Sequence, residues 1–316
     1  MNKYFIWPES TFVKAIFNWP FITSSTKIES DLHKMFPSGY PVLCSSGRSS
    51  IYLIMRHLKK TRSDFVGVFP YASHCVIDAI SRLTTPCFGI ESKNCDLRVI
   101  YHQWGYVQET KIENSSIDDC VDSLYKKGRK LFPSGSKYEI WSLPKILGTS
   151  SGGILWCKNK LDAEKLKVLR DKNGSSFFQW ILRLISKKKS FLYNYWNGGE
   201  CHAGKLSLLQ TSEIHSSLKK WDEILTDRLI KFNLLWKFAV DGLKKPTDRF
   251  PCIIPIKFNK SLFELIKSDF PSGTRMMEKI ETDNSSKMVK VIPIPIHQGI
   301  DLEWLKKINR FLTKIG

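Results

Sequence analysis

The stretch "YPVLCSSGRSSIYLIMRHLKK", Tyr40 to Lys60, sets the expectation for the fold. Its apolar start predicts a short buried strand, which Gly47 ends. The part that follows has apolar side chains at positions 51, 53, 54, 55 and 58, a spacing that suits a helix packed on a sheet. A strand that leads straight into a helix is the first half of the unit from which parallel sheets are built.

The same alternation continues along the chain. Strand-like segments are predicted at 64–70, 85–90, 97–104, 115–123, 137–144 and 152–159, and a helix at 73–83. This order predicts the α/β class: a large domain whose mostly parallel sheet is flanked by helices.

The second half of the chain changes character. Leucines and aromatic residues at spacings of three and four predict helices over 161–172 and within 204–243. Strands at 250–258 and 290–296 and helices at 261–270 and 301–315 then predict a smaller α+β domain. We therefore expect three parts: an N-terminal arm with a lead-in helix (1–39), a large domain (40–243) and a small C-terminal domain (244–316).

Composition narrows the classes of protein. The 316 residues are 42% hydrophobic, enough for a sizeable core, and the formal net charge is +19. Such a charge could serve nucleic acid, an anionic membrane face or a phosphate-rich small substrate, or could be a solvated surface. No recognition helix or aromatic-basic platform for nucleic acid accompanies it. The eight cysteines include no C-x-x-C pair, so we expect reduced thiols and no structural metal.

No segment predicts a membrane span or a cleaved leader. The apolar run Phe177–Ile185 is interrupted by Gln179 and Arg183 and is far shorter than the ~20 residues that cross a bilayer. Near the start of the chain, "PES" at 8–10 interrupts any signal-peptide core. The expected location is the cytoplasm.

Two stretches combine residues that could hold a ligand at the carboxyl ends of strands. "CSSGRSS", Cys44 to Ser50, would point backbone N–H groups at an anion. The same residues would also be found in an ordinary helix cap that binds no ligand. Asp118 and Asp119 would lie at the sheet edge where open α/β folds bind ligands, or in a surface turn. Because neighbouring residues of a strand point to opposite faces, only one of these acids can face a given site.

A third stretch, "YEIWSLPKILGTSSGGILW", carries Lys145. A lysine that acts as a covalent amine must be held beside its electrophile, whereas most lysines are only solvated charges. Lys145 lies between Pro144 and Ile146, with Ser142 three residues before it. The pair Gly152 and Gly153 allows close backbone approach. This context favours a chemical role.

In their order, these stretches resemble the fold-type-I pyridoxal-phosphate (PLP) enzymes, and among them the nucleotide-sugar aminotransferases of the DegT/StrS type. Further similar segments lie between them: "VFPYASHCVIDAI", "FGIESKNCDL" and "VIYHQWGY". The resemblance extends from about Ser45 to Lys158 and is weaker beyond, where "LYNYW" at 192–196 is similar to a Tyr-Asn-Tyr loop of the family.

The resemblance implies a role for each matching residue. Lys145 would bind PLP covalently and shuttle protons, and Asp119 would pair with the pyridine nitrogen. His74 would stack on the ring, and His102 would contact substrate. The phosphate candidates are Gly47, Arg48, Ser49 and Ser142, together with Asn194, which would reach across a homodimer to the neighbouring phosphate.

Departures from the family pattern accompany these matches. Asp122 stands where the family has a glutamine near the phenolic oxygen of the cofactor, and Ser142 lies three rather than five residues before the lysine. The later half of the chain is also shorter than in typical members.

The resemblance implies amino transfer from L-glutamate to a nucleotide-linked keto-sugar in O-antigen, capsule or related polysaccharide biosynthesis. The alternatives are a dehydratase and a catalytically silent scaffold. Relatives that dehydrate have histidine in place of the lysine, so Lys145 argues against the first; Asp122 and the shortened tail favour the second.

Overall fold

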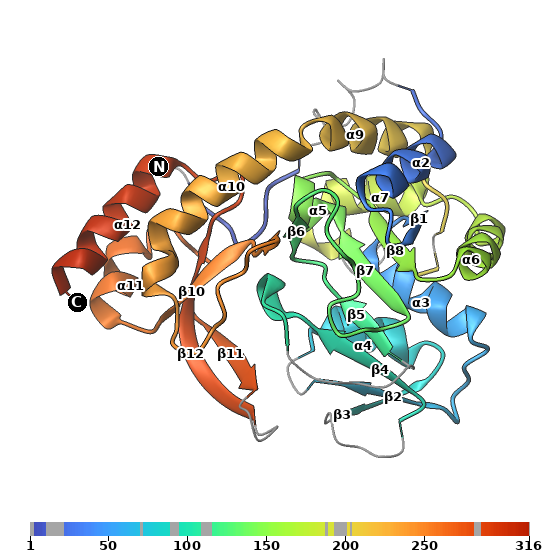
Figure 1. Ribbon diagram of the computed structural model, residues 1–316, viewed down its shortest axis with the longest axis horizontal. Coiled ribbons are helices and arrows are strands. Elements are labelled where there is room, and N and C mark those ends of the chain that lie inside the picture. Colours follow the sequence, from blue (N-terminus) through green and yellow to red (C-terminus); the bar gives the residue numbers. More distant parts are fainter. Residues whose placement is uncertain are drawn as a thin grey trace.

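The computed structural model describes residues 3–10, 22–69, 72–88, 95–108, 116–186, 189–192, 201–202, 204–280 and 286–315. Figure 1 shows two units: a large sheet wrapped by helices, and a smaller unit, coloured orange to red, built from the end of the chain. Among the described residues, no helix has the length and apolar character that crossing a membrane requires.

The large unit is built on a seven-stranded sheet. In sheet order its strands are β1 (Tyr40–Cys44), β8 (Gly153–Cys157), β7 (Tyr138–Ser142), β5 (Ser116–Asp119), β4 (Leu97–Tyr101), β2 (Phe65–Val68) and β3 (Thr85–Phe88). From β7 to β3 all neighbours are parallel, whereas β8 runs antiparallel to both β7 and β1. The mostly parallel sheet predicted from the alternation is confirmed.

Helices and short 3₁₀ turns cover this sheet. They are α2 (Ser25–Met35), α3 (Gly47–His57), α4 (His74–Ser81), η2 (Gln103–Gly105), α5 (Leu143–Leu147), α6 (Lys160–Lys172), α7 (Phe177–Ser186), η3 (Ser190–Leu192) and α9 (Leu208–Lys219). The predicted α3 forms because Ser46 caps it: its hydroxyl accepts from the Ser49 N–H, and the Ser49 hydroxyl accepts from the Ser46 N–H. All residues of 49–55 are buried against the sheet.

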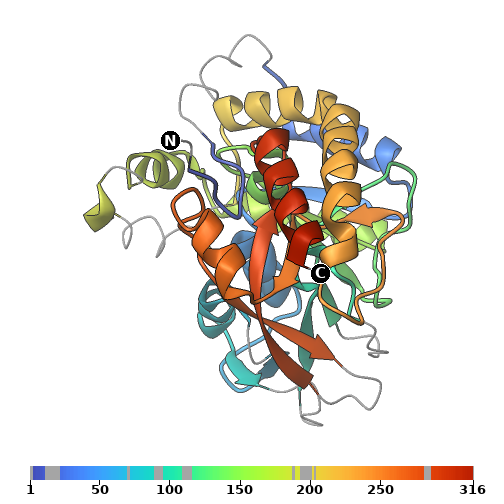
Figure 2. The same cartoon turned by 90° about the vertical axis from the view of Figure 1, so that its left-hand side faces the viewer.

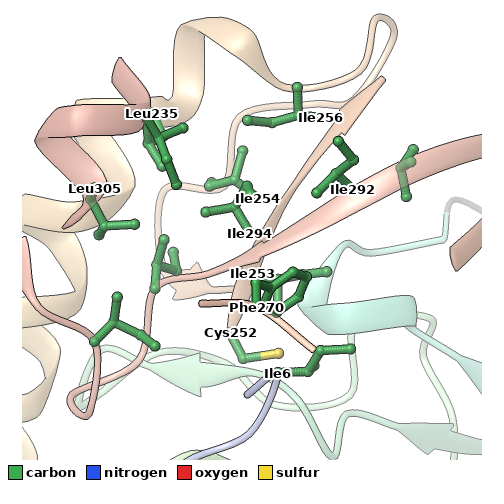
Figure 3. Close-up of a cluster of buried hydrophobic side chains, with 14 of the residues drawn as sticks. Ile6, Leu235, Cys252, Ile253, Ile254, Ile256, Phe270, Ile292, Ile294 and Leu305 are labelled. Carbon is green, nitrogen blue, oxygen red and sulfur yellow. The ribbon is translucent and has the colours of Figure 1, made fainter. Parts of the chain in front are cut away.

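The small unit has its own sheet and core. Its elements are α10 (Trp221–Leu235), η4 (Trp236–Phe238), β10 (Ile253–Lys257), α11 (Lys260–Ile266), β11 (Arg275–Ile280), β12 (Ser286–Pro295) and α12 (Leu302–Ile315), with sheet order β10-β12-β11. The pair β6 (Leu124–Tyr125) and β9 (Arg249–Phe250) connects the two units. Figure 2 shows α10 and α12 side by side, and Figure 3 shows the isoleucine-rich core beneath them.

The N-terminal arm, residues 3–10, is anchored in the small unit. The Tyr4 N–H donates to the Asp269 carbonyl at 2.7 Å, and the Tyr4 ring lies 4.5 Å from the Trp304 ring, centroid to centroid. Ile6 joins the small unit's core beside Cys252 (Figure 3). This anchoring fixes where the next residue, Trp7, lies.

The predicted fold class, a large α/β domain with a smaller C-terminal unit, is confirmed. The elements α5, β6, α7 and β11 were not predicted. Leu143 and Pro144 were expected in the preceding strand but begin α5, where a proline near the start suits a helix. The run that forms α7 indicates from sequence only that it is too short for a membrane span, and β11 contains polar residues that break the alternation of a half-buried strand. Helix α7 and strand β11 matter below, because each contributes an arginine to the same cavity.

Candidate active site

A cavity of about 770 Å³ opens at the carboxyl ends of the parallel strands. Residues from both units and from the N-terminal arm line it, among them Trp7, Ser46, Gly47, Arg48, Cys75, Tyr101, Asp119, Ser142, Lys145, Arg183 and Arg275. This is the sheet edge at which the sequence predicted ligand binding. The predicted lysine, acid and anion-binding loop thus meet in one place.

Strand geometry separates the two neighbouring acids. Asp119 lines the cavity, whereas the Asp118 carboxylate turns the other way and lies 3.0 Å from the His102 ring nitrogen Nε2. The prediction that only one of the pair can face a site is therefore confirmed. Asp118 serves the interior, and Asp119 is the acid available for chemistry.

Burial changes the acidity of Asp119. The side chain is almost fully enclosed, and this loss of solvation raises its pKa to about 7, with Asp122 adding to the rise and Lys145 opposing it. A carboxyl group in such a place is held negative only by a nearby cation. Asp119 is therefore suited to pair with a positively charged ring nitrogen.

Lys145 lies in the short helix α5, directly after β7. Its amine Nζ is 3.1 Å from Asp122 Oδ1 and 4.4 Å from the centroid of the Trp7 ring. Burial alone would lower the pKa of this amine, but Asp122, Cys75 and Asp119 raise it above its ordinary value. The amine is thus stabilised as a cation inside the cavity.

The start of α3 supplies the candidate anion site. Ser46, Gly47 and Arg48 line the cavity, and α3 is long enough for its first N–H groups to attract an anion. Ser142 lines the same cavity and makes no side-chain capping bond to α5. Ser49, also predicted here, is fully buried, and its hydroxyl bonds Ser45 and Ser46 instead.

Three further predicted residues lie elsewhere or outside the described chain. His74 is exposed at the start of α4 and is not among the lining residues. His102 is buried: its Nδ1 accepts from the Gln108 N–H at 3.0 Å, which leaves the ring hydrogen on Nε2 facing Asp118. Asn194 falls outside the described residues.

The cavity also contains residues that sequence reasoning did not select. Trp7 comes from the arm, Arg183 from α7 and Arg275 from β11. Together with Arg48 they add an aromatic face and three guanidinium groups to the site. A partial signal was available: Arg183 is the charged residue of a mostly apolar helical run, and a charge in such a place can mark a functional residue.

Gly152 and Gly153 fix the loop that carries the candidate anion site. Gly152 has a φ of +108°, and its N–H donates to the Ser45 carbonyl at 2.8 Å. A Cβ on Gly153 would lie 2.4 Å from the Ser46 carbonyl carbon and 2.7 Å from the Gly47 nitrogen. Gly153 is therefore required by contact with the start of α3, and Gly152 by its positive φ and by the close side chains of Ile214 and Leu143.

Gly153→Ala should lower the free energy of unfolding by about 3 kcal/mol, because backbone atoms of the loop must move. Urea unfolding measures this. Gly128→Ala is the matched control: its φ is +75° with no atom within 4 Å of an added Cβ, so strain alone should cost about 1 to 2 kcal/mol. Equal losses in the two variants would contradict the tight contact.

A family model described as PLP-dependent aminotransferase matches residues 28–314, nearly the whole chain. The chain belongs to this family of PLP-dependent aminotransferases. Lys145, Asp119 and the start of α3 therefore line the cavity of a protein whose family uses PLP. Among curated proteins, no sequence matches the chain.

Solved structures share the fold at low identity. Spr1654 of Streptococcus pneumoniae, described as a sugar aminotransferase, has 13% identity and a TM-score of 0.66, with 100% of this chain and 98% of that chain covered. A DegT/DnrJ/EryC1/StrS aminotransferase of Brucella abortus has 11% identity and a TM-score of 0.65, with 96% and 95% covered.

A third structure is PseC of Helicobacter pylori, an aminotransferase involved in the biosynthesis of pseudoaminic acid. It has 14% identity and a TM-score of 0.63, with 98% of each chain covered. These structures confirm the predicted fold across the full length of the chain, the small unit included.

The residues of the cavity fit PLP. An amine, a buried carboxyl group and a helix start with an arginine match the aldehyde, the ring nitrogen and the phosphate of this cofactor, and all three open into one space. The cavity, at about 770 Å³, is within the size range of small-molecule sites.

Proposed function

We propose that this aminotransferase moves an amino group from an amino-acid donor, L-glutamate, to a nucleotide-linked keto-sugar. The observation that carries the proposal is the cavity that Lys145 and Asp119 share, which Arg48, Arg183 and Arg275 also line. Guanidinium groups bind carboxylates and phosphates in paired hydrogen bonds, so this lining suits a dicarboxylate donor and a diphosphate-bearing acceptor.

The cofactor, when bound, supplies an electron sink that stabilises negative charge on the substrate carbon. Lys145 would hold the cofactor through its Nζ and would carry the proton that leaves the substrate carbon. Asp119 would pair with the ring nitrogen and favour its protonated form. The start of α3, with Arg48 and Ser142, would hold the phosphate.

The proposal extends to assembly and product. The chain would act as a homodimer in which Asn194 contacts the cofactor phosphate of the neighbouring subunit. The product would be an amino sugar for surface polysaccharide such as O-antigen or capsule. Supporting the sugar substrate is the likeness of the whole chain to structures described as sugar aminotransferases.

The test starts from purified protein with bound PLP, which should be yellow. L-Glutamate alone should convert the cofactor to its amine form and release one 2-oxoglutarate per site. Nucleotide keto-sugars are then offered one by one, and mass spectrometry follows the amino product. A protein that takes up no added PLP would contradict the proposal and favour the silent scaffold. Uptake without glutamate turnover would point to a dehydratase.

A further inference from the structure

Asp122 forms a buried cluster with two residues of the cavity. Its carboxylate is fully enclosed: Oδ2 accepts from the Tyr101 hydroxyl at 2.8 Å, and Oδ1 lies 3.1 Å from the Lys145 amine. Tyr101 ends β4, Asp122 follows β5, and Lys145 follows β7. Three neighbouring strand ends therefore bring a hydroxyl, a carboxylate and an amine into one chain of contacts.

This arrangement makes sense only if the amine carries a charge. A carboxylate without exposure is costly unless a cation pairs with it, and Lys145 is the cation in contact. The Trp7 ring, 4.4 Å from the same amine, also favours a cation. A neutral side chain at this position would give no such pairing.

Other titratable groups lie near the cluster. Asp119 and Cys75 line the same cavity and, like Asp122, raise the pKa of the Lys145 amine. Cys252 and Arg228 interact electrostatically with Asp122; burial raises the pKa of the Cys252 thiol and lowers that of Arg228 to about 10.

Burial is the opposing influence, because loss of solvation disfavours the charged form of the amine. The ion pair with Asp122 is the largest contact that offsets it. Arg48, Arg183 and Arg275 line the same cavity.

We propose that Asp122 is a positioning residue that sets the charge and aim of the Lys145 amine: its Oδ1 keeps the nitrogen protonated and holds it in place in the cofactor-free chain. The Tyr101 hydroxyl engages Oδ2, which leaves Oδ1 for the amine. The proposal rests on the proposed function in taking Lys145 as the cofactor-binding lysine.

The test measures the charge of the amine directly in the full chain freed of cofactor. Trace acetic anhydride labels only neutral amines, and mass spectrometry of the Lys145 peptide gives its labelling rate from pH 6 to 11. In the unaltered chain the Lys145 midpoint should lie above that of Lys160, whose side chain is 71% exposed. In Asp122→Asn it should fall by at least about one pH unit, so labelling at pH 7 becomes roughly tenfold faster.

Two variants keep the test decisive. Asp122→Gln removes the same charge, so it replaces Asp122→Asn if that protein does not fold. Asp227→Asn removes a matched partner elsewhere, 2.7 Å from Lys231, and should leave Lys145 unchanged. An unchanged Lys145 midpoint in a folded Asp122 variant, or a midpoint below that of Lys160 in the unaltered chain, would overturn the proposal.

Added PLP separates this inference from the proposed function. PLP should protect Lys145 of the unaltered chain from labelling. If it gives no protection, Lys145 is not the cofactor lysine and the proposed function fails. The midpoints measured without cofactor still decide whether Asp122 controls the amine.

Discussion

Lys145→Ala should still bind PLP through the phosphate site, but without a covalent bond and with activity lowered by at least about 10³-fold. The variant loses both the nucleophilic nitrogen and the proton carrier, and general acid–base catalysis alone contributes about 10²- to 10⁴-fold. Borohydride trapping followed by peptide mass spectrometry should find the cofactor on Lys145 in the unaltered protein and on no peptide in the variant.

The matched control for this experiment is Lys160→Ala. Lys160 begins α6, and its side chain is 71% exposed, so removal should change neither the trapped adduct nor turnover. A borohydride-stable adduct on another lysine of Lys145→Ala would show that the wrong amine has been assigned. Unchanged turnover in that variant would exclude any covalent role for Lys145.

The place of Lys145 and Asp119 in the cavity could be predicted because it follows from local geometry. A lysine directly after a strand, with a glycine pair beyond it, is confined to the carboxyl edge of the sheet. Alternation along β5 meant that one of Asp118 and Asp119 would face that edge. The close approach expected of Gly152 and Gly153 is likewise a local backbone property, and the contact with Ser46 bears it out.

Residues whose position depends on distant packing could not be predicted. Trp7 reaches the cavity because Tyr4 and Ile6 anchor the arm in the core of the small unit. Most residues of that core lie about 250 positions further along the chain. Arg275 arrives on a strand of the other unit. His102 lies near the end of a predicted strand and was expected, from the family resemblance, to contact substrate. In the structure its ring instead pairs with Asp118 in the interior.

Asp119→Asn should reduce activity by roughly 10² to 10⁴-fold, because a neutral carboxamide no longer favours the protonated ring nitrogen. The same variant should alter how the stability of the cofactor-free chain depends on pH. The folded-state pKa of Asp119 is about 7, against an ordinary value of 3.8. Two independent measurements therefore bear on one residue.

The sign of the stability effect follows from proton binding. Between about pH 4 and pH 7 the folded chain keeps a proton on Asp119 that the unfolded chain has released, so the free energy of unfolding falls as pH rises. Below pH 4 the contribution is fully present, and above pH 7 it is lost. The whole change is at most about 4 kcal/mol, because one pKa unit corresponds to about 1.4 kcal/mol.

Urea unfolding of the cofactor-free chain at pH 5, 6, 7 and 8 measures this slope. Asp119→Asn should lack it, so the stability of the variant relative to the unaltered chain should rise from pH 5 to about pH 7 and then level off. Asp222→Asn is the control, since the Asp222 side chain is 70% exposed and should leave the slope unchanged. Parallel curves for the unaltered chain and Asp119→Asn would mean that Asp119 is ionised in the folded chain before cofactor binds. In that case, added PLP should change the slope of neither curve. If Asp119 instead pairs with the bound cofactor, PLP should remove the slope of the unaltered chain and leave that of Asp119→Asn unchanged.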